Sequence, residues 1–313
     1  MKRAHQALEN WDIQPTDVNL AAERENKVYR VTTPNGNYAL RQHRRGYRTD
    51  AELASELNWM AAVKASGLDV PQPIAAKDGT YLTVIDDVQF DILTWLPGRQ
   101  LGAHGTPLDL ENPEQTFRTL GQSMAKLHNA SDAWIPPTDF TRPAWNADGL
   151  IGETPLWGRF WDNPTLAHGQ KELLESFRAK ARAALKEGDH DFGLIHADML
   201  RENVLVDGEV LRIIDFDDGG HGFRLFELAT TLFRVKDEPN SVELTTALID
   251  GYQSIRPMNI THLPLFMALR ACTYVGWIVT RMELPNAEKR NIEHIQNATQ
   301  AVAKWLETEL SHV

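Results

Sequence analysis

Residues 193–230 of the chain read GLIHADMLRENVLVDGEVLRIIDFDDGGHGFRLFELAT, and this stretch decides the fold class. Apolar runs at 204–206 and 211–214 flank Asp207-Gly208, a dipeptide typical of a two-residue β-hairpin turn. In an antiparallel hairpin the start of the first strand and the end of the second lie at the same open end. This geometry predicts that Asn203 lies beside Asp215, and we expect the preceding loop to bring Asp198 to the same place.

The side chains expected at this end of the hairpin are oxygen donors. Two carboxylates and a carboxamide suit Mg²⁺, which prefers carboxylate, carbonyl and phosphate oxygens. Asp and Asn near strand ends also act as turn formers or caps, and for any one of these residues that interpretation stays open. The whole pattern, H-x-D-x-x-x-x-N followed by an apolar hairpin and I-I-D-F, matches a kinase catalytic-loop Asp and Asn with a later metal-binding Asp.

The segments before this stretch predict a strand-rich first domain. Residues 27–33 and 38–42 alternate apolar and polar side chains around Asn35-Gly36, which indicates a second hairpin. A helix should follow, because Thr49 and Glu52 form a capping-box pair ahead of an apolar stripe. Two further strands, at 81–85 and 90–96, end before Pro97-Gly98.

The rest of the chain is predicted to be mainly helical, with an irregular loop at 134–164. One expected helix begins at Pro113. Four others are expected at 171–186, 225–233, 242–255 and 263–282. A last helix should bury one face made of Ile292, Ile295, Val302, Trp305 and Leu310. We therefore predict two domains, 1–96 and 97–313.

Composition and charge exclude several classes of protein. The 43 acidic side chains exceed the 32 basic ones by 11, which does not favour a nucleic-acid partner. The single cysteine, Cys272, allows no internal disulfide, so a reducing compartment is expected. The start of the chain lacks the apolar run of a signal peptide. The most apolar stretch, 265–280, contains Arg270 and is short for a membrane span, so we expect a cytoplasmic protein without a membrane partner.

The stretch 193–230 closely resembles the aminoglycoside phosphotransferase/choline kinase-like group, and within it the homoserine kinase type II and bacterial stress-response kinase branch. Four other segments support the resemblance: ENKVYRV at 25–31, YALRQHRRGYRTDAELASELNWMAAV at 38–63, LTWLPG at 93–98 and LGQSMAKLH at 120–128. The resemblance implies an α+β, protein kinase-like two-lobe fold. In that fold a small antiparallel-sheet lobe binds nucleotide and a larger helical lobe carries catalysis and the substrate.

The resemblance also implies roles for the residues of the central motif. Asp198 would be the catalytic base that accepts the proton of the substrate hydroxyl. Asn203 and Asp215 would hold Mg²⁺ against the phosphates, with Asp217 either a second metal ligand or a simple loop acid. His196 would brace the catalytic loop through hydrogen bonds.

In the nucleotide lobe the resemblance assigns Arg41 to the place of the usual strand lysine. Glu56 borders the buried helix stripe and is its expected partner, because Glu52 already has a capping role. The nucleotide loop contains no glycine, but Asn26 fits the family pattern, and backbone N–H groups around residues 25–27 could face phosphate. The adenine is expected against the backbone of the hinge residues Thr94, Trp95 and Leu96.

These features predict an ATP- and Mg²⁺-dependent kinase that phosphorylates a hydroxyl of a small molecule, such as an amino alcohol, a homoserine-like compound or an aminoglycoside-like compound. A Ser/Thr protein kinase is an alternative, although the short segment between Asp215 and Glu227 leaves no obvious activation segment. A nucleotide-binding pseudokinase is another, motivated by Arg41. The sequence Asp215-Phe-Asp217-Asp-Gly219 also resembles the D-x-D-G nucleophile motif of haloacid-dehalogenase phosphatases. The sequence leaves the oligomeric state open.

Overall fold

The computed structural model describes residues 1–23, 26–103 and 105–310, and the side chains up to Thr308. The chain divides into two compact units, each built from separate segments. The first unit contains Met1–Leu101, Asn129–Arg142 and Glu202–Asp217, and the second contains Gly102–His128, Pro143–Arg201 and Asp218–Val313. The hairpin at 204–213, termed the catalytic hairpin because it follows the predicted catalytic loop, belongs to the first unit, whereas the loop before it belongs to the second unit.

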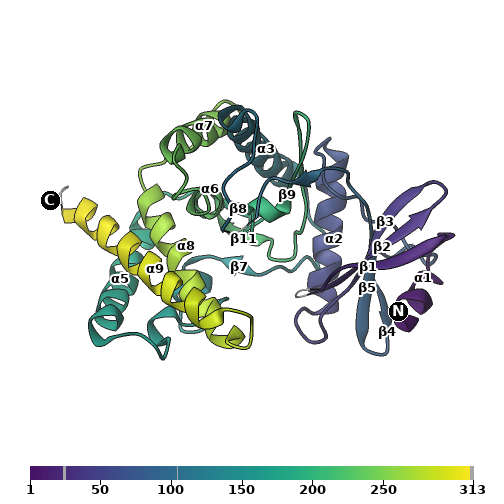
Figure 1. Cartoon of the computed structure of the whole chain (residues 1–313), viewed down its shortest axis with the longest axis horizontal. Helices are drawn as coiled ribbons and strands as arrows, with labels where there is room; N and C mark the ends of the chain where they lie inside the picture. The colour runs from purple at the N-terminus through teal and green to yellow at the C-terminus, as the bar shows by residue number, and fades with distance from the viewer. Residues whose placement is uncertain (24–25, 104, 311–313) are drawn as a thin grey trace. The chain divides into compact units, whose positions relative to one another are not determined.

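The first unit is built on an antiparallel sheet with the strand order β1-β2-β3-β5-β4 (Figure 1). Its strands are β1 (Asp17–Glu23), β2 (Lys27–Thr33), β3 (Gly36–Gln42), β4 (Thr83–Ile85) and β5 (Val88–Thr94). The predicted β2–β3 hairpin is confirmed, but Thr33 lies opposite Gly36, so its two turn residues are Pro34 and Asn35, one position before the predicted Asn35-Gly36. Gly36 has a φ of +137°, a conformation that favours glycine at the turn. Helix α1 (Lys2–Leu8) was not predicted, and it buries Ala4, Ala7 and Leu8 in the core of this sheet.

Helix α2 (Asp50–Ala65) follows β3 and begins as its sequence predicts. The Thr49 hydroxyl accepts the Glu52 N–H at 3.2 Å, and the Glu52 carboxylate accepts the Thr49 N–H at 2.9 Å. These two bonds satisfy N–H groups that the first turn leaves without partners. Glu56 is completely buried on this helix, beside Leu53 and Leu57. The helix therefore carries a carboxylate into the interior of the first unit.

The catalytic hairpin forms a second, three-stranded sheet of the first unit, in the order β10-β9-β6. Strands β9 (Val204–Asp207) and β10 (Val210–Ile213) form the predicted hairpin, with Asp207 opposite Val210 and Val204 opposite Ile213. The two turn residues are therefore Gly208 and Glu209, one position later than the predicted Asp207-Gly208. Strand β6 (Arg99–Gln100) adds to the β9 edge. The 3₁₀ turn η2 (Arg201–Asn203) leads into β9.

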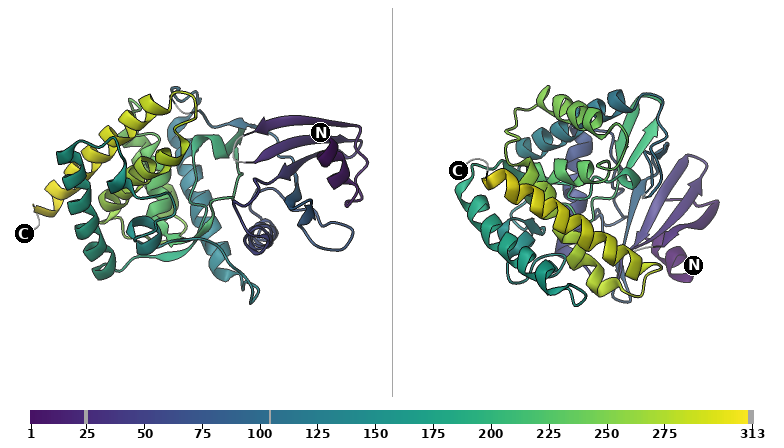
Figure 2. Two further views of the ribbon diagram at one scale, coloured as in Figure 1. Left: turned by 90° about the horizontal axis from the view of Figure 1, so that it is seen from below. Right: turned by 60° about the vertical axis from the view of Figure 1, so that its left-hand side comes forward.

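The second unit is mainly helical. Its helices are α3 (Pro113–Ala133), α4 (Ala147–Ile151), α5 (His168–Glu187), α6 (Arg224–Phe233), α7 (Ser241–Gln253), α8 (Leu263–Trp277) and α9 (Ala287–Leu310). Only the part of α3 up to His128 belongs to this unit. The short segments η1 (Phe160–Asp162) and η3 (Ile278–Arg281) join them, and a small sheet has the order β7-β11-β8. Its strands are β7 (Ala144–Trp145), β8 (Phe192–Ile195) and β11 (Gly220–Phe223). Helix α9 lies across α8 and beside α5 (Figures 1 and 2).

Helix α8 is the centre of the second unit's core. The span Leu263–Arg281 is long and apolar enough to cross a membrane by length and composition, but 67% of it is buried inside the structure. A core helix of a globular protein passes the same test, so this one span is weak evidence for a membrane segment. Cys272 on this helix is a buried free thiol, and burial raises its pKa well above the usual value.

The prediction that Ile292 lies on the buried face of α9 was wrong. Ile292 is 58% exposed, whereas Ile295, Val302 and Trp305 are buried. The buried face also runs through Asn291, and Ile292 is displaced from it by one residue, or 100° around the helix. Ile292 therefore points away from the core.

Candidate active site

The open end of the catalytic hairpin brings two predicted metal ligands together. The Ile214 N–H donates to the Asn203 carbonyl at 2.9 Å, which continues the β9–β10 ladder and places Asn203 next to Asp215, as predicted. Asn203 is 7% exposed, whereas Asp215 is exposed. Asp215 has a φ of +68°, in the left-handed region, which costs energy for any residue with a side chain. Strained backbone of this kind is enriched at functional sites.

The segment that follows Asp215 is anchored by two arginines. Arg142 donates from Nη2 to the carbonyls of Phe216 at 3.0 Å and Asp217 at 2.6 Å. Arg48 donates to the same Asp217 carbonyl at 3.1 Å. The Phe216 ring is buried and packs edge-on against Trp59, with ring centroids 5.2 Å apart. These contacts hold the backbone on one side of Asp215.

Arg142 also belongs to a buried ionic cluster of the first unit. We define the ionic cluster as Arg41, His43, Glu56, Asp91 and Arg142. Arg41 binds Asp91 through a bidentate pair at 2.8 Å and 2.8 Å, and binds Glu56 at 2.8 Å. The Glu56 carboxylate also accepts from Arg142 at 3.3 Å, and His43 lies 2.6 Å from Asp91. The expected Arg41–Glu56 contact is therefore present, in a network larger than the one predicted.

The charges of the ionic cluster stabilise one another in a dry environment. Burial alone would raise the pKa of Asp91, but the neighbouring Arg41 and His43 lower it to about 2. Burial likewise opposes ionisation of Glu56, and the charges of Arg41 and Arg142 outweigh it, so that its pKa is lowered. Burial would lower the pKa of Arg41, whereas Asp91 and Glu56 raise it well above the usual value. The carboxylates and both guanidinium groups are therefore charged at neutral pH.

The environment of Arg41 suits an arginine at the position that the family resemblance assigns to a strand lysine. Its Nε, Nη1 and Nη2 atoms each donate to a carboxylate of the ionic cluster. A planar guanidinium can form such a fork, whereas an ammonium group offers a compact point charge. Only 7% of the Arg41 side chain is exposed. Whether Arg41 contacts phosphate stays a prediction, and these contacts fix its orientation.

The other predicted nucleotide residues lie on the same unit. The Asn26 side chain is half-buried, and its Oδ1 accepts the Arg44 N–H at 3.1 Å. In the hinge, the Thr94 N–H donates to Gln72 and the Trp95 N–H donates to Asn37, at 2.9 Å and 3.1 Å.

These hinge contacts single out Leu96. Within the described residues the Leu96 N–H has no backbone acceptor, unlike the N–H groups of Thr94 and Trp95. Residue 25, part of the segment expected to face phosphate, lies outside the described residues.

The catalytic loop of the second unit contains a second strained residue. Ala197 has a φ of +63°, in the left-handed region, and is completely buried. Glu227 on α6 accepts the N–H groups of His196 at 2.5 Å and Ala197 at 3.3 Å. The Asp198 N–H donates to Nδ1 of His196 at 3.3 Å, which is the bracing expected of this histidine. Asp198 itself is 20% exposed at its side chain.

Glu227 is a buried acid with an unusual environment. Burial raises its pKa, and the hydrogen bonds from the catalytic loop oppose this only in part. His128 lies 3.7 Å from the Glu227 carboxylate and pairs through Nδ1 with the Tyr252 hydroxyl at 2.7 Å. The carboxylate thus links α6 to the backbone of the catalytic loop.

Three charged residues with strong contacts to predicted site residues were not predicted from the sequence. Asp91 and Arg270 each had a local signal, since each is the lone charge in an apolar segment (VQFDILT and LPLFMALRACTYVGW). A charge in such a segment indicates a buried partner. Arg142 lies in an irregular loop, and its neighbours in the sequence carry no comparable signal.

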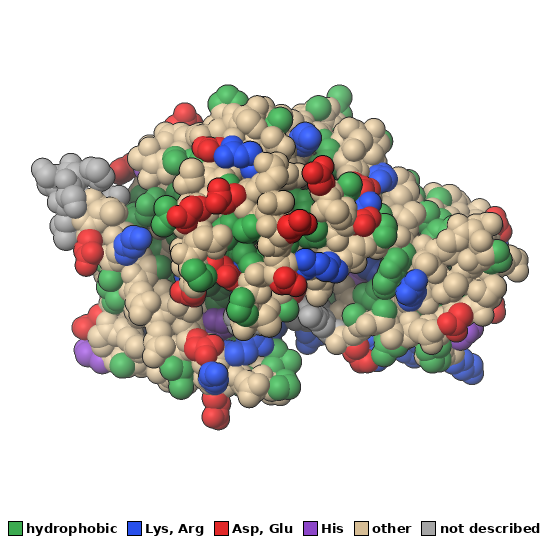
Figure 3. All heavy atoms as spheres, turned by 45° about the horizontal axis from the view of Figure 1, so that its top comes forward, with side chains coloured by type: hydrophobic (Ala, Val, Ile, Leu, Met, Phe, Trp, Pro, Cys, Tyr) green, Lys and Arg blue, Asp and Glu red, His purple; other side chains and the backbone are tan. Residues whose placement is uncertain are grey.

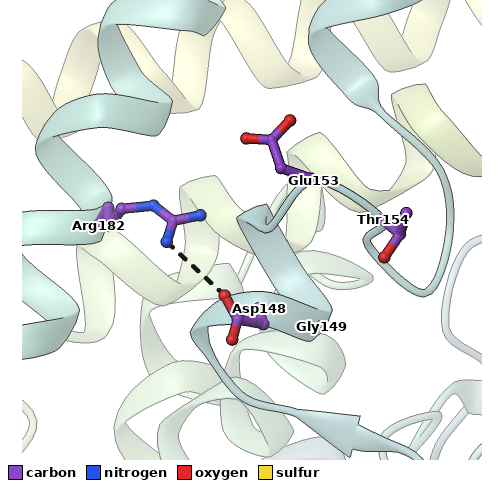
Figure 4. A pocket seen from close by; sticks show the side chains of 5 residues that line it. All are labelled: Asp148, Gly149, Glu153, Thr154 and Arg182. Carbon is purple, nitrogen blue, oxygen red and sulfur yellow. Dashed lines mark ion pairs between the residues drawn. The ribbon is translucent and has the colours of Figure 1, made fainter.

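A separate pocket lies in the second unit and contains none of the predicted site residues. It has a volume of about 480 Å³ and is lined by Asp148, Gly149, Glu153, Thr154 and Arg182 (Figure 4). Arg182 and Asp148 face one another across it at 3.7 Å.

On the face shown in Figure 3, acidic and basic side chains are interspersed rather than gathered by sign. The charge on this face therefore does not point to a ligand.

No group of three or more His, Cys, Asp or Glu side chains among the described residues forms a ready metal site. The predicted metal ligands differ from such a group because one of them is the carboxamide of Asn203. Phosphate oxygens and water are expected to supply the remaining ligands. Mg²⁺ is commonly bound by one or two carboxylates together with substrate phosphates. An exposed Asp215 carboxylate beside Asn203 fits this requirement.

Comparisons with known proteins agree with the motifs. The model of the family described as "Phosphotransferase enzyme family" matches residues 18–260. The homoserine kinase of Acidiphilium cryptum is 29% identical over 272 residues, which cover 82% of this chain and 77% of the relative. The homoserine kinase of Neisseria meningitidis serogroup B is 29% identical over 264 residues, covering 82% and 79%.

Two solved structures share the fold. The microcompartment-associated aminopropanol kinase aligns with a TM-score of 0.84 and 28% identity, over 98% of each chain. An amicoumacin kinase in complex with AMP-PNP and Ca²⁺ aligns with a TM-score of 0.77 and 18% identity, over 96% of this chain and 92% of the other. The expected kinase-like α+β fold is confirmed.

Proposed function

Because the chain belongs to the phosphotransferase enzyme family, we propose that it transfers the γ-phosphate of ATP to the hydroxyl group of a small amino alcohol. The observation that carries the proposal is the end of the catalytic hairpin, where Asn203 lies beside a strained and exposed Asp215. The similar homoserine kinases and aminopropanol kinase support the acceptor class. Homoserine and aminopropanol are both short compounds that carry a hydroxyl and an amino group.

In this proposal the chain's residues divide the reaction between them. Asp198 accepts the proton of the acceptor hydroxyl while that oxygen attacks the γ-phosphorus and the bond to ADP breaks. Asn203 and Asp215, with Asp217 as a further candidate, hold the metal ion. Bound Mg²⁺ neutralises charge on the phosphates, which is most of what phosphoryl transfer requires besides positioning.

The first unit provides the remaining parts of the proposed nucleotide site. Arg41 contributes positive charge near the phosphates in an orientation fixed by Glu56. Leu96 offers its backbone to the adenine, and Asn26 belongs to the loop over the phosphates. A cytoplasmic location, where ATP is available, is part of the proposal.

The test is an acceptor screen that couples ADP release to a panel of hydroxyl compounds. The panel contains L-homoserine, aminopropanol, choline and an aminoglycoside, each with ATP and Mg²⁺. The matched control is L-2-aminobutyrate, which is homoserine without its hydroxyl group. We expect ADP release with an amino alcohol, none above background with the control, and a phosphate ester of the acceptor by mass spectrometry.

Other outcomes of the screen separate the competing functions. Tight ATP binding without acceptor-dependent ADP release across the panel would indicate a nucleotide-binding pseudokinase. Labelled phosphate on added protein rather than on the small molecules would indicate a protein kinase. Either result contradicts the proposal.

A further inference from the structure

Arg270 is a buried cation in the most apolar helix of the protein. It is the only charged residue of α8, and its side chain is completely inaccessible to solvent. A guanidinium in this position is costly unless its hydrogen bonds and its charge are matched. If this position served packing alone, a methionine or leucine side chain would be sufficient. The contacts of Arg270 therefore bear on why the charge is there.

The guanidinium of Arg270 contacts the catalytic loop directly. Its Nη2 atom donates to Oδ1 of Asp198 at 3.1 Å and to the Tyr274 hydroxyl at 2.9 Å. Its Nη1 atom approaches the Ala197 carbonyl at 3.4 Å. Burial would lower the pKa of Arg270, but Tyr274 and Asp198 raise it, so that the group stays cationic.

Aromatic rings enclose the rest of the guanidinium. Its central carbon lies 4.6 Å from the centroids of Trp157 and Tyr274 and 5.6 Å from that of Phe226. Rings at these distances attract a cation and also restrict how it can rotate. The direction in which Arg270 donates to Asp198 is therefore fixed by packing.

The catalytic loop is held from two sides, by the carboxyl group of Glu227 and by the guanidinium of Arg270. Glu227 on α6 accepts the N–H groups of His196 and Ala197, while Arg270 on α8 donates toward the Ala197 carbonyl and the Asp198 carboxylate. Between them Ala197 keeps a left-handed conformation that an alanine does not adopt without support. The residue held in place by this arrangement is the proposed base.

We propose that Arg270 is a positioning residue for phosphoryl transfer: it binds one carboxylate oxygen of Asp198 and so directs the other toward the acceptor hydroxyl. This inference rests on the proposed function, because it takes Asp198 as the base. An error of about 1 Å in the placement of a reacting group costs on the order of 10²-fold in rate. Loss of Arg270 should therefore act on kcat and leave nucleotide binding unchanged.

The test compares Arg270→Met and Arg270→Lys with the wild type and with a matched control, Arg178→Met. Arg178 also stacks on a tryptophan, Trp161, but it pairs with Glu153, and the contacts of the described residues include none between Arg178 and the catalytic loop. We expect about 10²-fold lower kcat for Arg270→Met, with the KM for ATP within about threefold of wild type. Arg270→Lys should recover part of the loss, and Arg178→Met should turn over like the wild type.

Two further measurements separate positioning from packing. Low millimolar guanidinium should restore activity to Arg270→Ala, whereas urea, a neutral molecule of the same shape, should not. Amide hydrogen exchange at residues 196–200 should accelerate in Arg270→Met and remain at the wild-type rate in Arg178→Met. Rescue by both solutes, or unchanged exchange, would mean that Arg270 serves packing.

The outcomes also distinguish this inference from the proposed function. A wild-type protein that phosphorylates no hydroxyl compound overturns the proposed function and with it the role of Arg270. An active wild type whose folded Arg270→Met variant keeps its kcat within about threefold overturns the positioning role alone.

Discussion

Asp91→Asn removes one charge from the ionic cluster without changing the volume of the side chain. In the folded protein the pKa of Asp91 is lowered from 3.8 to about 2, which corresponds to a contribution of about 2 kcal/mol to stability at neutral pH. The variant also leaves the buried Arg41 guanidinium with one carboxylate partner fewer. Removing one member of a buried ion pair typically costs about 3–5 kcal/mol, which we expect here at pH 7.

The pH dependence of this effect has a definite sign. A carboxyl group whose pKa is lowered by folding stabilises the protein above its unfolded pKa, and that stabilisation is lost as the pH falls toward the folded pKa. The wild type therefore loses about 1 kcal/mol of the Asp91 contribution between pH 7 and pH 3, whereas Asp91→Asn has none to lose. The difference between the two unfolding free energies should shrink by that amount.

The assay is urea unfolding of wild type and Asp91→Asn at pH 7, 5, 4 and 3. The control is Asp87→Asn, which changes an exposed acid one residue before β5 and should shift stability by no more than about 0.5 kcal/mol. A loss below about 1 kcal/mol at pH 7, or a loss that stays constant down to pH 3, would refute the reasoning.

Four other substitutions test separate features. Arg142→Gln should weaken the binding of Mn²⁺, a paramagnetic substitute for Mg²⁺, about tenfold in the ADP complex by electron paramagnetic resonance, because the Asp217 carbonyl loses the shorter of its two arginine hydrogen bonds. The raised pKa of Glu227 means that wild-type stability falls as the pH rises above about 4.5, and Glu227→Gln should lack this fall in urea titrations at pH 5 and 7. Gly276→Ala should cost at least about 1–3 kcal/mol, because its Cβ would lie 2.4 Å from a backbone oxygen of a facing loop. In contrast, Gly169→Ala meets open space on a helix and should raise the melting temperature slightly.

Patterns that depend on neighbouring residues predicted much of this fold. The Thr49 cap lies where the sequence indicates, and both hairpins turn within one residue of the predicted Asn35-Gly36 and Asp207-Gly208, because turn and cap chemistry acts over a few residues. The same reasoning placed Asn203 beside Asp215, since a hairpin fixes which residues share its open end. Local chemistry was sufficient for these features.

Partners of buried charges were not predictable in the same way. Arg41 meets Asp91 across 50 positions, Arg142 meets Glu56 across 86, and Arg270 meets Asp198 across 72. Which acid a buried arginine reaches depends on how helices and sheets pack, and a single sequence carries no direct record of that. The lone charges in β5 and α8 indicate only that partners exist.

The most direct test of the central claim compares Asp198→Asn with Asp207→Asn. Asp207 is an exposed acid of the same hairpin and pairs only with Arg212 among the described residues. We predict that both variants bind ATP with wild-type affinity, that Asp207→Asn forms the phosphorylated acceptor at the wild-type rate, and that Asp198→Asn forms it at least about 10²-fold more slowly. Wild-type transfer by a folded Asp198→Asn protein would contradict the assignment of Asp198 as the base.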